Sequence, residues 1–172
     1  MNAGVGSNGV GADGTGADGT GADEVTADEV IASLGLAELP VEGGWFGQSW
    51  RSPEASAIYY LLREGEFSGV HRLDHLEVYA HHRGAPLRML LLHPDGAVTR
   101  PVLGPDLAAG QRPQVVVPAG VWQAGEPVGG WSLVGTVVVP PYTDDVVTFG
   151  AADALARAYP DHAADLRRLC RL

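Results

Sequence analysis

The sequence predicts an all-β fold, a barrel or sandwich of short strands, and two observations lead to this prediction. Between residues 43 and 139, short apolar segments alternate with turn signals such as Glu64-Gly65, Pro94-Asp95-Gly96 and Gly129-Gly130. No helical periodicity interrupts these segments, and many short strands without intervening helices are typical of sandwiches and barrels. We expect strands at 45–50, 57–62, 69–73, 76–82, 87–92, 98–103, 114–117, 121–124 and 131–139.

A short helix is expected before the strands. Thr26 followed by Glu29 matches a capping box, and Gly35 can end the helix in the left-handed conformation. The preceding residues 1–25 consist almost entirely of Gly, Ala, Asp, Thr, Val, Ser and Asn. Because such a segment has no large apolar side chain to bury, we expect a disordered tail there.

Helices are also expected after the strands. The segments 151–158 and 161–172 are rich in Ala, Leu and Arg, and Pro160 marks a break between them. The length suits one domain. The predicted domain covers 26–172, with the barrel at about 43–149 and a helical segment at 151–172.

Charge and hydropathy narrow the possible partners and location. The formal net charge is −10, and six acidic residues come before residue 30 with no basic residue beside them: Asp13, Asp18, Asp23, Glu24, Asp28 and Glu29. The rest of the chain is only mildly acidic and has no basic stripe, which argues against a nucleic-acid partner. No apolar run approaches the roughly 18–20 residues that span a membrane, and no signal sequence begins the chain. We expect a cytoplasmic protein without a membrane partner.

Two residue types that often supply covalent catalysis are scarce. All 11 residues counted as Lys or Arg are arginines, which excludes a Schiff-base lysine, pyridoxal-phosphate anchoring and a Walker-type phosphate loop. The single cysteine, Cys170, lies near the end of the chain and cannot form an internal disulfide. A terminal helix is also a poor place for the base that a thiol nucleophile needs.

Polar side chains concentrate in segment 71–82, which holds four of the six histidines. Alternate residues of a strand share a face, so Glu77, Tyr79 and His81 should point the same way. His71 can join them across the bend at Asp74-His75. A carboxylate, a phenol and imidazoles that meet inside a barrel suit either metal binding or proton transfer.

A second polar position follows the turn Pro118-Ala119-Gly120, which directs the chain into a strand and places Gln123 three residues after the glycine. If this strand lies beside segment 71–82, Gln123 approaches His71 and Glu77. The amide side chain of Gln123 would then orient a bound molecule.

Aromatic side chains are candidates for the pocket lining. Trp122 adjoins Gln123 and is expected in the pocket, and Trp45 is a further candidate. Of the adjacent pair Tyr59 and Tyr60, only one can face inward. We expect this to be Tyr59, which has the parity of Ala57 and Leu61.

These motifs resemble those of cupins. Gly69, His71, Glu77 and Gly84 are similar to the first cupin motif, and Pro118-x-Gly120-x-x-Gln123 is similar to the second. The resemblance is to the cupin-5 type in particular, from about Leu36 to Tyr159, and implies a double-stranded jelly-roll barrel. It rests on Glu42-Gly43-Gly44-Trp45-Phe46, Arg51-Ser52, 57–62, Phe67-Ser68-Gly69, 71–74 and 116–124.

The departures from the cupin pattern bear on metal binding. Leu73 stands where the family's first motif has its second histidine, and Gln123 replaces the histidine of the second motif. His71 and Glu77 remain, with Gln123 as a weak oxygen donor, so no metal cofactor is favoured, although a divalent ion on these three residues stays possible. Ala80 and Gly47 also differ from the group's usual residues, which suggests a pocket adapted to a different ligand.

Three functions remain open. The first is a metal-independent enzyme for non-redox acid/base chemistry (an isomerase, epimerase or cyclase), in which His71 and Glu77 move protons, Tyr79 or Tyr59 stabilises an oxyanion and Gln123 orients the substrate. The second is a metabolite- or sugar-binding protein without catalysis. The third is a metal-dependent enzyme that uses His71, Glu77 and Gln123.

Two further expectations concern context. The resemblance implies a homodimer that pairs through a sheet edge, and the Val-rich segment 134–139 suggests a strand covered on both faces. The use of arginine alone and the Gly/Ala/Asp-rich start are typical of a coding sequence rich in G and C. Such genomes often carry secondary-metabolite pathways, so a role there is an association rather than a physical inference.

Overall fold

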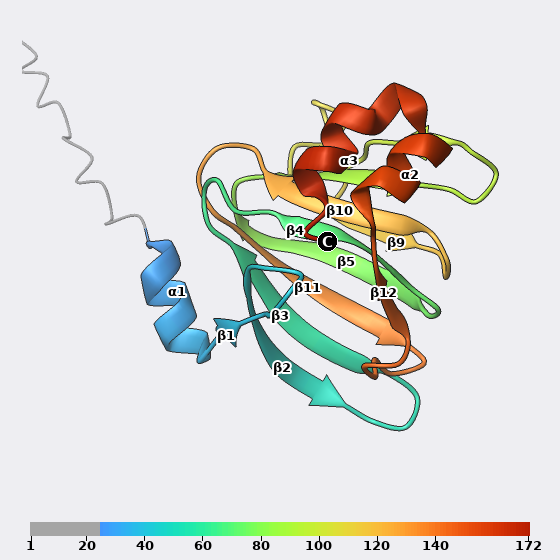
Figure 1. The fold of residues 1–172 in the computed structure, drawn as a ribbon. Helices are drawn as coiled ribbons and strands as arrows, with labels where there is room; N and C mark the ends of the chain where they lie inside the picture. Colours follow the sequence, from blue (N-terminus) through green and yellow to red (C-terminus); the bar gives the residue numbers. More distant parts are fainter. Residues whose placement is uncertain (1–24) are drawn as a thin grey trace, which may run out of the picture.

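The computed structural model describes residues 25–172 and contains two facing antiparallel sheets (Figure 1). The first sheet, here called sheet A, has the order β1 (Ala37–Glu38), β2 (Trp45–Arg51), β3 (Ser56–Leu62), β11 (Ser132–Val139), β5 (Leu76–Gly84) and β9 (Gln114–Val117). Sheet B has the order β12 (Val147–Phe149), β4 (Ser68–Leu73), β10 (Trp122–Pro127), β6 (Leu87–Leu92) and β7 (Val98–Thr99), and β8 (Val102–Leu103) also pairs with β6. This double-stranded jelly roll confirms the predicted fold class.

The strand predictions differ from the structure at a few places. The segment 98–103 is split into β7 and β8 around Pro101, which has no N–H to donate to a sheet. The short edge strands β1 and β12 were not predicted, because two or three residues carry too little pattern. Strand β10 continues to Pro127, past the predicted end at 124, since it pairs with β6 along its length.

The helices form where local signals place them. In α1 (Ala27–Leu34), the backbone N–H of Glu29 donates to Thr26 Oγ1 over 3.3 Å, and the Thr26 N–H donates to Glu29 Oε2 over 2.8 Å. Gly35 ends this helix at φ 61°, which confirms both caps. After α2 (Ala152–Ala158), a 3-10 turn η1 (Pro160–His162) begins at Pro160 and leads into α3 (Ala163–Leu169). The predicted tail at 1–25 falls almost wholly outside the described residues.

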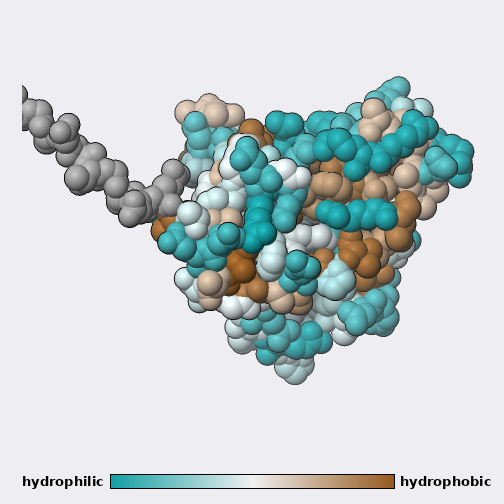
Figure 2. Space-filling model, turned by 60° about the vertical axis from the view of Figure 1, so that its left-hand side comes forward, coloured by the Kyte–Doolittle hydropathy of each residue, from teal (hydrophilic) through white to brown (hydrophobic). Residues whose placement is uncertain are grey.

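The helices cover the outer faces of the barrel. Helices α2 and α3 pack over sheet B around Val70, Leu90 and Leu92 (Figure 1). Helix α1 packs on sheet A against Leu61 and Leu133. Strand β3 is therefore buried on both faces near these residues. The molecular surface shown in Figure 2 mixes hydrophilic and hydrophobic residues. Within residues 25–172, no helix is long and apolar enough to cross a membrane.

Candidate functional site

A cavity of about 410 Å³ lies inside the barrel, within the size range of small-molecule sites. Its walls come from the inner faces of both sheets, the loop before β2 and the loop after β11. The lining residues are Leu39, Pro40, Glu42, Phe46, Gln48, Arg51, Ser56, Ile58, Tyr60, His71, Leu73, Glu77, Tyr79, Thr136, Val138, Tyr142 and Asp144.

Strand register places the predicted carboxylate and phenol on the inner face of sheet A. Glu77 lies opposite Val138, and Tyr79 lies opposite Thr136, and all four residues line the cavity. The predicted common face of Glu77 and Tyr79 is therefore present. Both side chains are buried, with 5% and 4% of their surface exposed.

Glu77 forms the predicted contact between the two polar segments. Gln123 Nε2 donates a hydrogen bond of 2.8 Å to Glu77 Oε2. Burial raises the pKa of Glu77, the charge of Glu42 raises it further, and His71 and Gln123 oppose the rise without cancelling it. Within residues 25–172, Gln123 Oε1 is buried without a hydrogen-bond partner. Gln123 is not among the residues that line the cavity, so it supports Glu77 from behind, and its expected contact with a bound molecule is absent from the described lining.

His71 is oriented by the backbone. Its Nδ1 lies 2.8 Å from the carbonyl oxygen of Gly69, and since a carbonyl can only accept, Nδ1 carries the proton. Nε2 is thereby the ring nitrogen that the backbone leaves free, and it lies 3.8 Å from Glu42 Oε2. Because His71 is on β4 and Glu77 is on β5, the two groups reach the cavity from opposite sheets.

Glu42 is a site residue that the sequence analysis did not assign. Ser68 Oγ donates to Glu42 Oε1 over 2.7 Å, and the Gly69 N–H donates to the Glu42 carbonyl over 2.8 Å. These bonds hold the carboxylate inside the cavity beside His71. Its only sequence signal was its place in the Glu42-Gly43-Gly44 motif, since a loop residue shows no strand periodicity.

Two buried tyrosines keep their protons. Burial raises the pKa of Tyr79 well above its usual range, and the carboxylate of Glu77 adds to the rise. Burial and the Glu42 charge do the same to the pKa of Tyr60. The Tyr60 hydroxyl donates to the Gly43 carbonyl over 2.8 Å, so Tyr60 anchors the loop that carries Glu42.

The expected inward position of Tyr59 is wrong. Tyr60 lines the cavity, whereas Tyr59 lies on the outer face of sheet A, near His82 and the α1 cluster. Both faces of β3 are apolar in this region because α1 covers the outer one, so parity with Leu61 could not identify the inner face.

The expected pocket position of Trp122 is also wrong. Gln123 faces inward, and adjacent strand residues face opposite ways. Trp122 accordingly packs outside sheet B with the α2 and α3 cluster, and the Arg72 guanidinium lies 4.9 Å from its ring centroid.

His81 shares the inner face but does not reach the cavity. Its register partner on β11 is Val134, two positions beyond Thr136 and away from the cavity. Its Nε2 lies 3.2 Å from the Ala85 carbonyl oxygen. His81 therefore contacts the turn after β5, at the end of the barrel away from the cavity. The expected ligand contact of His81 is therefore absent from the described lining.

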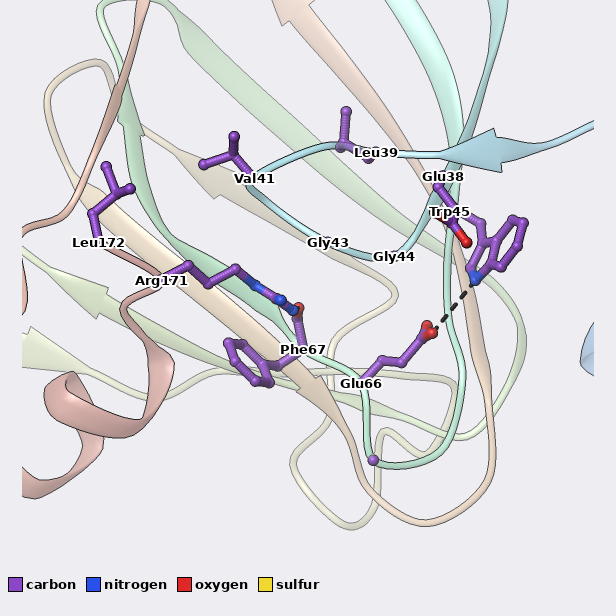
Figure 3. Close-up of a pocket in the computed structure, with 11 residues that line it drawn as sticks. Glu38, Leu39, Val41, Gly43, Gly44, Trp45, Glu66, Phe67, Arg171 and Leu172 are labelled. Atoms are coloured by element: carbon purple, nitrogen blue, oxygen red, sulfur yellow. Dashed lines mark hydrogen bonds between the residues drawn. The ribbon is translucent and has the colours of Figure 1, made fainter.

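Trp45 lines a different hollow, on the other side of the loop 39–44 (Figure 3). Its Nε1 donates to Glu66 Oε1 over 3.4 Å, and Arg171 lies at the opposite side of the hollow. This hollow is larger, about 790 Å³, but is open, and its lining within residues 25–172 includes no buried ionisable side chain. The barrel cavity is the candidate site because its polar groups are buried and converge.

Gly47 and Ala80 do not adapt the pocket, contrary to expectation. Gly47 pairs with Tyr59, and Ala80 pairs with Gly135, all on the outer face of sheet A. A Cβ at Gly47 would lie 2.9 Å from Leu36 Cδ2. The glycine therefore makes room for the segment that follows α1.

The cavity mouth is framed by β2 and the loop after β11. Arg51 Nη1 donates to the Tyr142 carbonyl over 2.8 Å, and the Tyr142 N–H donates to Ser56 Oγ over 2.9 Å. Asp144 lies on the same rim. Burial raises the pKa of Tyr142, as does the charge of Asp144.

The donor set does not fit a transition-metal ion. His71 offers one imidazole nitrogen, Leu73 offers no donor, and the Gln123 amide points its N–H group at Glu77. Among residues 25–172, no group of three or more His, Cys, Asp or Glu side chains is placed to hold an ion. Imidazole and thiolate donors supply most of the affinity for such ions, so no step is assigned to a metal.

Two facing antiparallel sheets around a buried polar cavity form a jelly-roll barrel, the class of fold to which cupins belong. The family described as "Cupin superfamily (DUF985)", Cupin_5, matches residues 28–149, and the chain belongs to this family. The resemblance inferred from the motifs is confirmed. A comparison with curated proteins gave no match.

Solved structures agree with this assignment. Protein SO0799 from Shewanella oneidensis is similar with a TM-score of 0.82 and 39% identity, over 86% of this chain and 99% of that chain. A hypothetical protein from Leishmania major has a TM-score of 0.79 and 24% identity, over 85% and 99%. Oxalate decarboxylase from Bacillus subtilis shares the fold alone, with a TM-score of 0.56 and 10% identity over 78% of this chain and 37% of that chain.

Proposed function

We propose that this protein is a metal-independent enzyme that performs non-redox acid/base chemistry on a small molecule, as an isomerase, epimerase or cyclase. The observation that supports it most is the pair of proton-transfer groups, Glu77 and His71, which reach one buried cavity from opposite sheets. Burial raises the pKa of Glu77, and a raised pKa makes a carboxylate a stronger base.

The proposed step moves one proton. The Glu77 carboxylate takes a proton from a carbon next to a substrate carbonyl and becomes the neutral acid, while negative charge develops on the carbonyl oxygen. The Tyr79 hydroxyl, which stays protonated, donates a hydrogen bond to this oxygen. Protonated His71 Nε2 returns a proton to the opposite face or to the adjacent carbon, and exchange between Glu77 and His71 restores the starting state.

A binding protein without catalysis is the alternative. The carboxylates of Glu42 and Glu77 would then only hold a metabolite by hydrogen bonds. In that case, changing Glu77 would weaken affinity and affect no rate. The distantly similar oxalate decarboxylase supports only the fold at 10% identity.

Deuterium exchange tests the proposal. Small aldoses and 2-oxo acids are incubated with protein in D₂O, and loss of the C–H signal beside the carbonyl is followed by NMR. We expect wild type to catalyse exchange in at least one compound and Glu77→Gln to slow it by about 10²–10⁴-fold, the usual contribution of a general base. Glu64→Gln, which changes an exposed carboxyl, should leave the rate unchanged.

Three outcomes would contradict the proposal. Exchange that persists in Glu77→Gln would remove Glu77 from the reaction, and a rate that needs a stoichiometric metal would favour the metal-dependent alternative. Compounds that bind to wild type without any exchange would indicate a binding protein.

We further propose a homodimer that forms through the outer face of sheet A. One row of apolar residues crosses five strands of this face: Trp50, Ala57, Val137, Val78 and Val116. Trp50, Val137 and Val116 are 52%, 38% and 54% exposed. In the single chain, strand β11 is therefore covered on only one face here, and a partner placed on this row would cover the other face, as expected for the Val-rich segment 134–139. The edge strands β1 and β9 are short, so a face offers more contact than the expected edge. A self-complementary apolar row suits a twofold axis.

A place in secondary metabolism is also part of the proposal. The support is the composition, since arginine is the only permanently basic side chain and Gly, Ala and Asp dominate the start of the sequence. This support is associational.

A further inference from the structure

Arg51 differs from the other charged groups of the cavity. It is the one arginine among the described lining residues, and within residues 25–172 it makes no ion pair. One of its N–H groups donates to the Tyr142 carbonyl, which leaves the other donors of the guanidinium for a ligand. The two hydrogen bonds that link Arg51 to Tyr142 and Tyr142 to Ser56 fix this guanidinium at the rim of the cavity.

The inner part of the cavity has the opposite charge. Glu42 and Glu77 both face it, and the two buried phenols contribute no positive charge. An anionic group placed there would lie against two carboxylates without a permanent cation. The remaining walls are apolar and include Phe46, Ile58 and Val138, so the inner cavity suits an uncharged body.

We propose that the cavity selects a small monocarboxylate, which Arg51 holds by its carboxylate at the mouth while its uncharged body extends inward toward Glu77 and His71. The planar guanidinium matches a carboxylate with two parallel hydrogen bonds. Asp144 on the same rim penalises a phosphate dianion more than a carboxylate, because repulsion grows with charge. This substrate class rests on the proposed function only in the role that it gives to Glu77 and His71.

Matched probes test the head group. Dissociation constants are measured by NMR titration for 3-phenylpropanoate, 3-phenylpropanamide, 3-phenylpropylamine and phenethyl phosphate, which share a similar apolar body. We expect the carboxylate to bind most tightly. In Arg51→Gln its affinity should fall by at least about tenfold, the usual effect of removing a charged hydrogen-bond partner, whereas the amide should be little affected.

Three other variants separate charge from folding. Arg83→Gln removes an exposed arginine that does not line the cavity and should leave the affinities unchanged. Arg51→Lys should bind the carboxylate with intermediate affinity, since it keeps the charge and loses the fork geometry. Asp144→Asn should tighten carboxylate binding, because it removes a negative charge from the rim. A variant that folds poorly would instead bind the carboxylate more weakly.

Several outcomes would overturn the proposal: equal binding of acid and amide, preference for the amine or the phosphate, or failure of all four probes to bind. Retention of carboxylate affinity in Arg51→Gln would do the same. The two proposals can fail separately. Carboxylate binding through Arg51 without deuterium exchange would contradict only the acid/base function, and Glu77-dependent exchange in a neutral compound would contradict only the monocarboxylate.

Discussion

Glu77 is a buried carboxyl whose protonation affects stability as well as chemistry. Its hydrogen bond from Gln123 is a neutral one, and His71 is the main group that opposes the rise of its pKa. Burial therefore dominates and raises its pKa above the ordinary value of 4.5. The folded chain binds this proton more tightly than the unfolded chain does.

The contribution of Glu77 to the stability of the wild type should fall as pH rises from 4.5 to the raised folded pKa of Glu77. Glu77→Gln has no charge to bury. Its free energy of unfolding, relative to that of wild type, should therefore increase as the pH rises through this window. The gain is about 1.4 kcal/mol for each unit between the two pKa values. Urea unfolding at several pH values measures it, with Glu64→Gln as the exposed control. Parallel stability curves for wild type and Glu77→Gln would show that the carboxyl is not desolvated.

At the scale of the elements, Gly84 ends β5 and turns the chain toward β6. Its φ is +82°, and a Cβ at this position would lie 2.2 Å from the carbonyl oxygen of Trp131. The glycine seven residues after Glu77 is therefore a structural residue, although the motif groups it with site residues.

A pair of glycine variants separates backbone conformation from steric contact. Gly65 has φ +79°, and a Cβ added there would meet nothing within 4 Å, so Gly65→Ala should cost only the left-handed conformation, about 1–2 kcal/mol. Gly84→Ala should cost about 1–3 kcal/mol more, as overpacking does. Chemical denaturation measures both. Equal losses would mean that the Trp131 carbonyl moves away freely.

At the scale of the whole molecule, the outer face of sheet A carries a row of exposed apolar residues that α1 leaves uncovered. The apolar row from Trp50 to Val116 on this face is extended by Val139 and Leu76, which pair with each other and are 43% and 37% exposed. A second copy that covers this row would hide it from water and bring the two barrels together back to back.

Sedimentation velocity tests the proposed dimer. We expect wild type to sediment as a dimer at micromolar concentration and Val137→Lys as a monomer, because the variant places a charge in the apolar row. Val128→Lys changes a valine of similar exposure, 42% against 38%, away from this face, and should remain dimeric. A monomeric wild type, or dissociation caused by both variants alike, would contradict the interface.

The sequence by itself determined the elements whose signals are local. Thr26, Glu29 and Gly35 specify α1 through contacts within a few residues. The alternation of Glu77 and Tyr79 identified one wall of the cavity, and the turn before Gln123 marked the start of a strand that pairs with the strand of His71. These inferences were possible because strand period and capping depend on neighbours in the chain.

Only the tertiary structure decided which face of each strand is the inner one. Tyr60 and Phe46 face the cavity while Tyr59, Trp45 and Trp122 face outward, since helices cover parts of both outer faces and erase the alternation of polar and apolar residues. Glu42 and Arg51 join the site through pairings and loops far apart in sequence. Such contacts depend on how the two sheets pack, and local patterns contain no information about that packing.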